Sequence, residues 1–179
     1  AKEYDLSSLR HLASVGEPLN AEAVVWSQEK FGLPFQDNFW QTEVAGPVLG
    51  TLPSFEVRLG KVGKPMPGVR ADVVDKNGEP VPSGQGGMLV FREPLPYMLR
   101  TVWNDPYRYA EYWSQIEGCY TAGDVAVCDD DGYFAVLGRS DDVINVAGHR
   151  LGTAESAGIS GIGSERTAVA FRRSRPSKS

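Results

Sequence analysis

The sequence predicts an α/β fold in which a short βαβ segment is followed by a region rich in antiparallel strands. A strand-forming segment at residues 9–15 precedes a turn and a helix-forming stretch, and another strand-forming segment follows at 35–40. Residues 70–91 contain two strand-forming segments with an Asn-Gly turn between them. Residues 124–137 form two further β-rich segments around an Asp-Gly turn, which predicts a β-hairpin.

The first predicted elements are a strand, a turn and a helix. The strand covers 9–15 (LRHLASV), and residues 16–19 (GEPL) turn the chain. Asn20 is a suitable N-cap because its side chain can accept a hydrogen bond from the first helical turn, and the helix would run toward Phe31-Gly32. In a βαβ layer the loop after a strand lies at the carboxyl edge of the sheet, where α/β proteins bind ligands.

The next predicted strand, 35–40 (FQDNFW), leads into Gln41-Thr42-Glu43. An acid and a hydroxyl at the carboxyl end of a strand suit a hydrated divalent cation and phosphate oxygens. A Thr-Glu pair alone is too short to identify such a site.

A loop and a set of strands follow. Residues 44–68 are rich in Gly and Pro, which predicts a loop. Strands are expected at Arg70–Val74 and Gly87–Phe91. Two aromatic-rich segments, 97–103 and 105–113, are expected to pack in the core, the second as a short helix with proline at its first position.

The hairpin at 124–137 would bring Asp124 close to Gly138-Arg139 at one end. Such a pair can bind a polyol, because the carboxylate accepts hydrogen bonds from two vicinal hydroxyls while the guanidinium donates in a fixed fork. From spacing alone, a salt bridge beside the turn is the alternative interpretation.

Linked motifs in this chain resemble the AMP-forming acyl-CoA synthetases of the adenylate-forming superfamily. The family's Tyr-Thr-x-Gly-Asp element stands at 120–124, and its Gly-Arg-x-Asp-Asp element stands at 138–142, followed by NVAGHR at 145–150. The segment 37–43 (DNFWQTE) is similar to the Trp-Gln-Thr-Glu motif of short-chain acyl-CoA synthetases such as acetyl-CoA synthetases. The resemblance covers residues 1–155.

The resemblance implies a site for ATP or AMP. Asp124 and Arg139 would hold the ribose hydroxyls, and Arg150 would lie near the phosphate. Glu43 would bind Mg²⁺, and Gly148 would lie near CoA. The other nucleotide contacts that the resemblance implies, with the Gly-Glu-Pro loop lining the adenine pocket, are Gly16, Glu17, Pro18, Asp37, Asn38, Phe39, Trp40, Gln41 and Thr42. Asn38 stands where acetyl-CoA synthetases are expected to have Thr, which puts one phosphate contact in question.

Trp40 would also close the acyl pocket and favour a short-chain carboxylate, because a bulky floor excludes longer acids sterically. The alternative is an ordinary core aromatic. Both interpretations can hold together, because an indole that forms a pocket floor is also buried.

The resemblance divides the chain into three parts. Residues 1–141 would be the C-terminal part of the AMP-binding large domain, with the later strands in a distorted β-barrel and Asp141 as the hinge. Residues 142–155 would start the small C-terminal domain. The stretch 156–179 diverges from the family, is rich in Gly, Ser and Arg, and is expected to be disordered. The chain is expected to be part of a longer protein, with a truncated, frame-shifted or naturally spliced end.

The composition limits the classes of partner that the chain is expected to bind. The net charge of −5 argues weakly against nucleic acid as the main partner. No apolar run approaches the roughly 18–20 residues that span a bilayer, so no membrane partner is expected. Two cysteines without CxxC spacing are expected to be free thiols in a reducing cytosol, which predicts a cytoplasmic protein.

The function implied by the resemblance is ligation of acetate, or another short-chain carboxylate, to CoA through acyl-AMP. The family's Gly/Ser/Thr-rich phosphate loop and C-terminal catalytic lysine have no counterpart in this chain, so the isolated chain is expected to be inactive. The alternatives are a nucleotide-binding remnant without turnover, a structural fragment, and part of a medium-chain acyl-CoA ligase.

Overall fold

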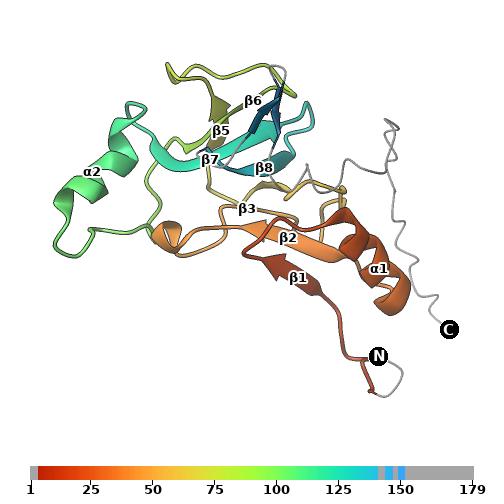
Figure 1. The fold of residues 1–179 in the computed structure, drawn as a ribbon. Coiled ribbons are helices and arrows are strands. Elements are labelled where there is room, and N and C mark those ends of the chain that lie inside the picture. The colour runs from red at the N-terminus through yellow and green to blue at the C-terminus, as the bar shows by residue number, and fades with distance from the viewer. Residues whose placement is uncertain (1–3, 141–143, 147–148, 152–179) are drawn as a thin grey trace.

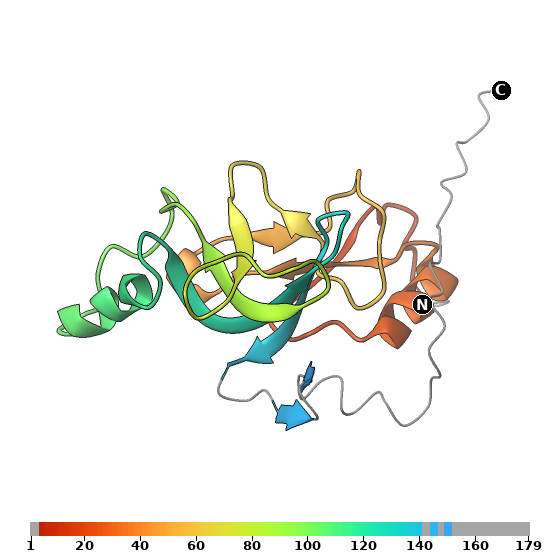
Figure 2. The same ribbon diagram turned by 90° about the horizontal axis from the view of Figure 1, so that it is seen from above.

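The computed structural model describes residues 4–140, 144–146 and 149–151. Within them the chain forms two four-stranded sheets that lie one over the other, with helix α1 at one end and helix α2 at the other (Figures 1 and 2). The expected tail 156–179 lies outside the described residues, and the domain boundaries at 141 and 155 remain predictions. Neither helix of the described part is long and apolar enough to cross a membrane.

The first sheet has the order β1-β2-β3-β4. Strand β1 (Leu12–Val15) pairs in parallel with β2 (Phe35–Phe39), and α1 (Ala21–Phe31) connects them, so the predicted βαβ segment is confirmed. Both strands are shorter than their predicted ranges. Strands β3 (Leu49–Gly50) and β4 (Lys64–Pro65) extend the sheet in antiparallel pairing.

The ends of α1 follow from the sequence. The Oδ1 atom of Asn20 accepts a hydrogen bond of 2.8 Å from the N–H of Glu22, which confirms the predicted N-cap. Gly32 ends the helix with a φ of 68°, and its N–H donates to the carbonyl of Gln28. The buried hydroxyl of Ser27 accepts from the N–H of Phe35 at 2.9 Å and so ties the helix to β2.

The second sheet is antiparallel, with the order β5 (Ala71–Val74), β6 (Gly86–Phe91), β7 (Tyr120–Cys128) and β8 (Phe134–Arg139). The predicted hairpin is confirmed as β7 and β8. The expected barrel is not found in the described residues, where β5 and β8 are the outer strands of the second sheet and an isolated bridge joins Phe134 of β8 to Gly63. A two-stranded antiparallel pair, β9 (Ile144–Val146) and β10 (His149–Leu151), follows.

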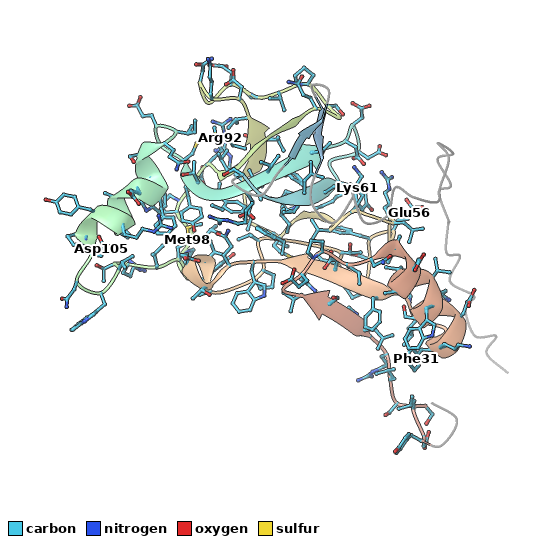
Figure 3. The ribbon with its side chains drawn as sticks, viewed as in Figure 1. Phe31, Glu56, Lys61, Arg92, Met98 and Asp105 are labelled. Carbon is cyan, nitrogen blue, oxygen red and sulfur yellow. The ribbon has the colours of Figure 1, made fainter. Side chains whose placement is uncertain are left out.

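The main core lies between the two sheets. Val48 and Leu49 from the first sheet region are fully buried against Phe91 and Tyr120 from the second. Figure 1 shows the resulting arrangement, with β5–β8 on one side and β1–β4 on the other. Arg92 and Lys61, labelled in Figure 3, lie outside this buried set. The two layers therefore share one hydrophobic core.

Helix α2 (Pro106–Ser114) confirms the predicted helix with Pro106 at its start, and the Asp105 carboxylate caps it by accepting from the N–H of Arg108 at 2.9 Å. Asp105 and Met98 lie at this end of the molecule in Figure 3. The prediction that the aromatic segments around α2 pack in the core is wrong in part. Trp103 and Tyr107 are 88% and 84% exposed, because the connection into α2 leads away from the sheets (Figure 1).

The backbones of the two sheet regions are hydrogen-bonded to each other at Gly63. Its N-terminal neighbour Val62 donates to the carbonyl of Phe134 at 2.9 Å, and the N–H of Phe134 donates to the carbonyl of Gly63 at 2.7 Å. Gly63 has a φ of 127°, and a Cβ there would lie 2.1 Å from the carbonyl oxygen of Gly50. Only glycine fits this crossing.

We expect Gly63→Ala to lower the free energy of unfolding by about 1–3 kcal/mol more than Gly84→Ala, because overpacking adds to backbone strain. Gly84 is the matched control, since its φ is 79° and a Cβ would meet nothing within 4 Å. Urea denaturation of both variants measures the difference. Equal losses would contradict the inferred close approach.

Candidate functional site

The predicted motifs meet where β2 ends and β7 begins to pair with β8. The side-chain amide of Gln41 donates from Nε2 to Oδ2 of Asp124 at 2.5 Å and to the carbonyl of Ala122 at 3.2 Å. Its Oε1 atom accepts from the hydroxyl of Tyr120 at 3.1 Å. One amide therefore joins two segments that are 83 residues apart in the sequence.

Asp124 and Arg139 lie opposite each other in the β7–β8 ladder, which confirms that the hairpin brings them to one end. The Nη1 atom of Arg139 is 3.9 Å from Oδ2 of Asp124 and donates to the carbonyl of Ala122 at 2.7 Å. The Asp124 side chain is buried, whereas that of Arg139 is 47% exposed. The pairing register shifts directly after Val125, and such bulges are common beside active sites.

Gly123 allows the guanidinium to lie against the backbone. Its φ is 75°, and a Cβ there would lie 2.9 Å from Nη2 of Arg139. Its carbonyl accepts from the N–H of Ser140 at 2.8 Å, which fixes the chain just after β8. The glycine of the Tyr-Thr-x-Gly-Asp element is thus favoured by its positive φ, and its lack of a side chain leaves room for the arginine of the next motif.

Glu43 lies on the short 3₁₀ helix η1 (Thr42–Val44) that follows β2. Its carboxylate accepts through Oε1 from the hydroxyl of Tyr112 on α2 at 2.9 Å, and its carbonyl accepts from the N–H of Leu99 at 2.8 Å. No group of three or more His, Cys, Asp or Glu side chains that could hold a metal gathers in the described residues. A single carboxylate fits Mg²⁺, which is usually bound by one or two carboxylates together with substrate phosphates.

Asp37 on β2 connects the predicted adenine loop to the sheet. Its carboxylate accepts from the backbone N–H of Asn38 at 2.9 Å and from that of Leu19 in the loop after β1. Burial raises the pKa of the Asp37 carboxyl to about 6, because the charged form is poorly solvated there. In the parallel ladder Val15 faces Asn38, so the turn that begins at Gly16 starts beside this pair.

The remaining predicted residues of this segment differ in exposure. Phe39 packs against the core, while Thr42 is exposed. Trp40 is 43% exposed, so the expectation that its indole is buried is wrong for the described residues. The reason is its position, since it follows the last residue of β2 and precedes η1. Glu17 and Pro18 are also exposed, as loop residues at a sheet edge.

Three predicted residues are not placed in this site. Asp141 and Gly148 lie outside the described residues. Arg150 belongs to β10, where its backbone pairs with Asn145.

Sequence reasoning missed Tyr112 and the bridging role of Gln41. Tyr112 lies in a segment that the sequence predicts only to pack in the core, yet its hydroxyl contacts the predicted metal residue. No local pattern distinguishes Tyr112 from Tyr107 on the same helix, which is 84% exposed. Only the tertiary packing of α2 against β7 separates their roles.

Comparison with known proteins supports the motif assignment. The family model described as "AMP-binding enzyme" matches residues 1–103, more than half of the chain. The acetyl-coenzyme A synthetase of Thiobacillus denitrificans is 49% identical over 160 residues, which is 86% of this chain and 24% of that protein. Those of Chromobacterium violaceum and Pyrobaculum aerophilum are each 47% identical over 161 residues, covering 86% of this chain and 25% and 24% of those proteins.

A solved structure shares the fold. The crystal structure of the anthranilate CoA ligase AuaEII in complex with anthranoyl-AMP matches with a TM-score of 0.76 and 29% identity, over 86% of this chain and 29% of that one. The predicted α/β fold, as a part of an adenylate-forming enzyme, is confirmed by this likeness. The chain spans about a quarter of the length of the curated relatives it matches. It belongs to the AMP-binding enzyme family, and its curated relatives are acetyl-coenzyme A synthetases.

Proposed function

We propose that this chain is part of an AMP-forming acyl-CoA ligase that activates acetate, or another short-chain carboxylate, with ATP and transfers the acyl group to CoA. The observation that carries the proposal is the 2.5 Å hydrogen bond from Gln41 to Asp124. It joins the segment proposed for phosphate, metal and acyl binding to the pair proposed for ribose binding.

Asp124 and Arg139 suit a ribose. A carboxylate has about four acceptor positions, so the hydrogen bond from Gln41 is compatible with hydrogen bonds from two ribose hydroxyls. The guanidinium of Arg139, held against Gly123 and the carbonyl of Ala122, is oriented before a ligand arrives. The guanidinium of Arg139 lies 3.9 Å from the buried Asp124 carboxylate, so the two opposite charges partly balance each other.

The other nucleotide groups can be assigned along β1 and β2. The exposed loop at Gly16, Glu17 and Pro18, held by Asp37, would line the adenine. The exposed hydroxyl of Thr42 would contact phosphate. Glu43 would hold Mg²⁺, which neutralises phosphate charge when bound.

The reaction would proceed in two displacements. A carboxylate oxygen of the acid attacks the α-phosphorus of ATP, and pyrophosphate leaves with the broken P–O bond. The CoA thiolate then attacks the acyl carbonyl, and AMP leaves. Both steps depend mainly on positioning and on neutralising charge. The acid, ATP and CoA would be the partners, and a cytoplasmic location would supply all three.

The relatives' names support a short acid, while the anthranilate ligase shows that this fold also serves a larger one. Substrate size must then depend on side chains around the acyl pocket, and Trp40 is the candidate in this chain. A medium-chain ligase would use the same nucleotide-binding residues. The bulky Trp40 favours a short-chain ligase over a medium-chain one, because it leaves less room for the acid.

We expect Gln41→Ala to weaken binding of AMP by about tenfold, because Asp124 loses the amide that orients it and such a bond to a charged group contributes roughly 1.5 kcal/mol or more. Gln85→Ala is the matched control on an exposed turn. Isothermal titration of both variants with AMP measures the effect. Equal affinities would show that the bridge has no part in the site.

The isolated chain is expected to bind AMP without synthesising acyl-CoA, because its sequence has no counterpart of the family's phosphate loop and catalytic lysine, whose charges would lower the barrier by several kcal/mol. Pyrophosphate release that depends on acetate and CoA is the measurement. Release above that of a Glu43→Ala control would contradict the expectation.

In the complete ligase, Trp40→Gly is expected to shift preference from acetate toward butyrate. The larger space admits further methylene groups, each worth about 0.8 kcal/mol when buried, while acetate loses the wall that positions it. The ratio of kcat/KM for the two acids measures the shift. An unchanged ratio would remove Trp40 from the acyl pocket.

A further inference from the structure

Glu43 is held by hydrogen bonds to its backbone, to its side chain and around its helical turn. The carbonyl of Gln41 accepts from the N–H groups of Val44 and Ala45, both at 3.0 Å, which closes η1 around Glu43. Its own carbonyl and its Oε1 atom accept from Leu99 and Tyr112. In the part of the chain that the structure describes, no hydrogen bond reaches Oε2 of Glu43.

Tyr112 is itself held rigidly. Its ring stacks on that of Tyr120, with centroids 5.5 Å apart and an interplanar angle of 15°. The hydroxyl of Thr121 donates to the carbonyl of Tyr112 at 3.1 Å, and the guanidinium of Arg108 lies 4.9 Å from the ring centroid. Tyr120 beneath it is fully buried. The position of the Tyr112 hydroxyl therefore follows from the core.

The two stacked tyrosines each donate to one residue of the same short segment. Tyr120 donates to Oε1 of Gln41 at 3.1 Å, and Tyr112 donates to Oε1 of Glu43 at 2.9 Å. A tyrosine phenol has one O–H to donate, and in Tyr112 that proton is directed to Glu43.

We propose that Tyr112 is a positioning residue that holds Oε1 of Glu43 and so presents Oε2 to the divalent cation that accompanies ATP. This inference rests on the proposed function. The phenol is a neutral donor that holds the Glu43 carboxylate in one orientation. Groups that orient a metal ligand in this way typically account for 10–100-fold in metal affinity.

The test uses Tyr112→Phe, which removes the hydroxyl and keeps the ring that stacks on Tyr120. Tyr107→Phe is the matched control, because it makes the same chemical change on the same helix at an 84% exposed position. Glu43→Gln removes the proposed metal ligand. Each chain is titrated with ATP by calorimetry, once with EDTA and once with Mg²⁺, and the ratio of the two affinities is compared.

Tyr112→Phe is expected to leave the affinity in EDTA unchanged and to reduce the gain from Mg²⁺ by about tenfold. Tyr107→Phe is expected to retain the full gain, and Glu43→Gln to lose it. A full gain in Tyr112→Phe, with the gain lost in Glu43→Gln, would overturn the inference while leaving Glu43 as the metal residue.

Two further outcomes show whether the inference about Tyr112 or the proposed function of Glu43 is wrong. Equal losses with and without Mg²⁺ in Tyr112→Phe would show a merely structural role and overturn the inference. A full gain in Glu43→Gln, or no binding of ATP by the unsubstituted chain, would overturn the proposed site and the inference with it.

Discussion

The hydrogen bond between the Gln41 amide and the Asp124 carboxylate connects the two layers of the molecule at the site. Gln41 follows β2 in the first sheet, and Asp124 belongs to β7 in the second. The carboxylate is buried, and the loss of one hydrogen bond to a charged group costs about 1.5–3 kcal/mol. Tyr120 of β7 also donates a hydrogen bond to the Gln41 amide. The geometry of the site therefore depends on how the two sheets pack.

That packing is set by apolar contacts and by close backbone approaches. Val44, Val48 and Leu49 pack with the buried side chains of the second sheet, directly after the segment that carries Gln41 and Glu43. At Gly63 the backbone comes close enough to β8 for two hydrogen bonds with Phe134. The polar site is therefore adjacent to well-packed core residues, and packing of this kind suits preorganised binding of a charged nucleotide.

The parts of the site that the sequence could predict are those with local geometry. The approach of Asp124 and Arg139 follows from one hairpin, whose Asp-Gly turn is visible in the sequence, whereas the register shift after Val125 is not. The cap at Asn20 and the proline that starts α2 are equally local. The family motifs identified further residues, although not how they contact each other.

The remaining features depend on contacts between distant segments. Nothing near Gln41 indicates that it reaches Asp124, and nothing near Tyr112 indicates that it reaches Glu43, 69 residues away. The expected burial of Trp40 and Trp103 failed for the same reason, because an aromatic residue indicates apolar surface but not what covers it. Whether the second sheet closes into a barrel also depends on which strands pair, and the sequence of a single strand does not determine that.

The central claim is that the Asp124–Arg139 end of the hairpin binds the ribose of an adenine nucleotide. Calorimetric titration of the chain with AMP and with 2′,3′-dideoxy-AMP tests it most directly, in the unsubstituted protein and in Asp124→Asn. We expect the unsubstituted chain to prefer AMP by at least about tenfold, since hydrogen bonds to a charged group contribute roughly 1.5–3 kcal/mol each, and Asp124→Asn to lose most of that preference. Equal affinity of the unsubstituted chain for the two nucleotides would contradict the account.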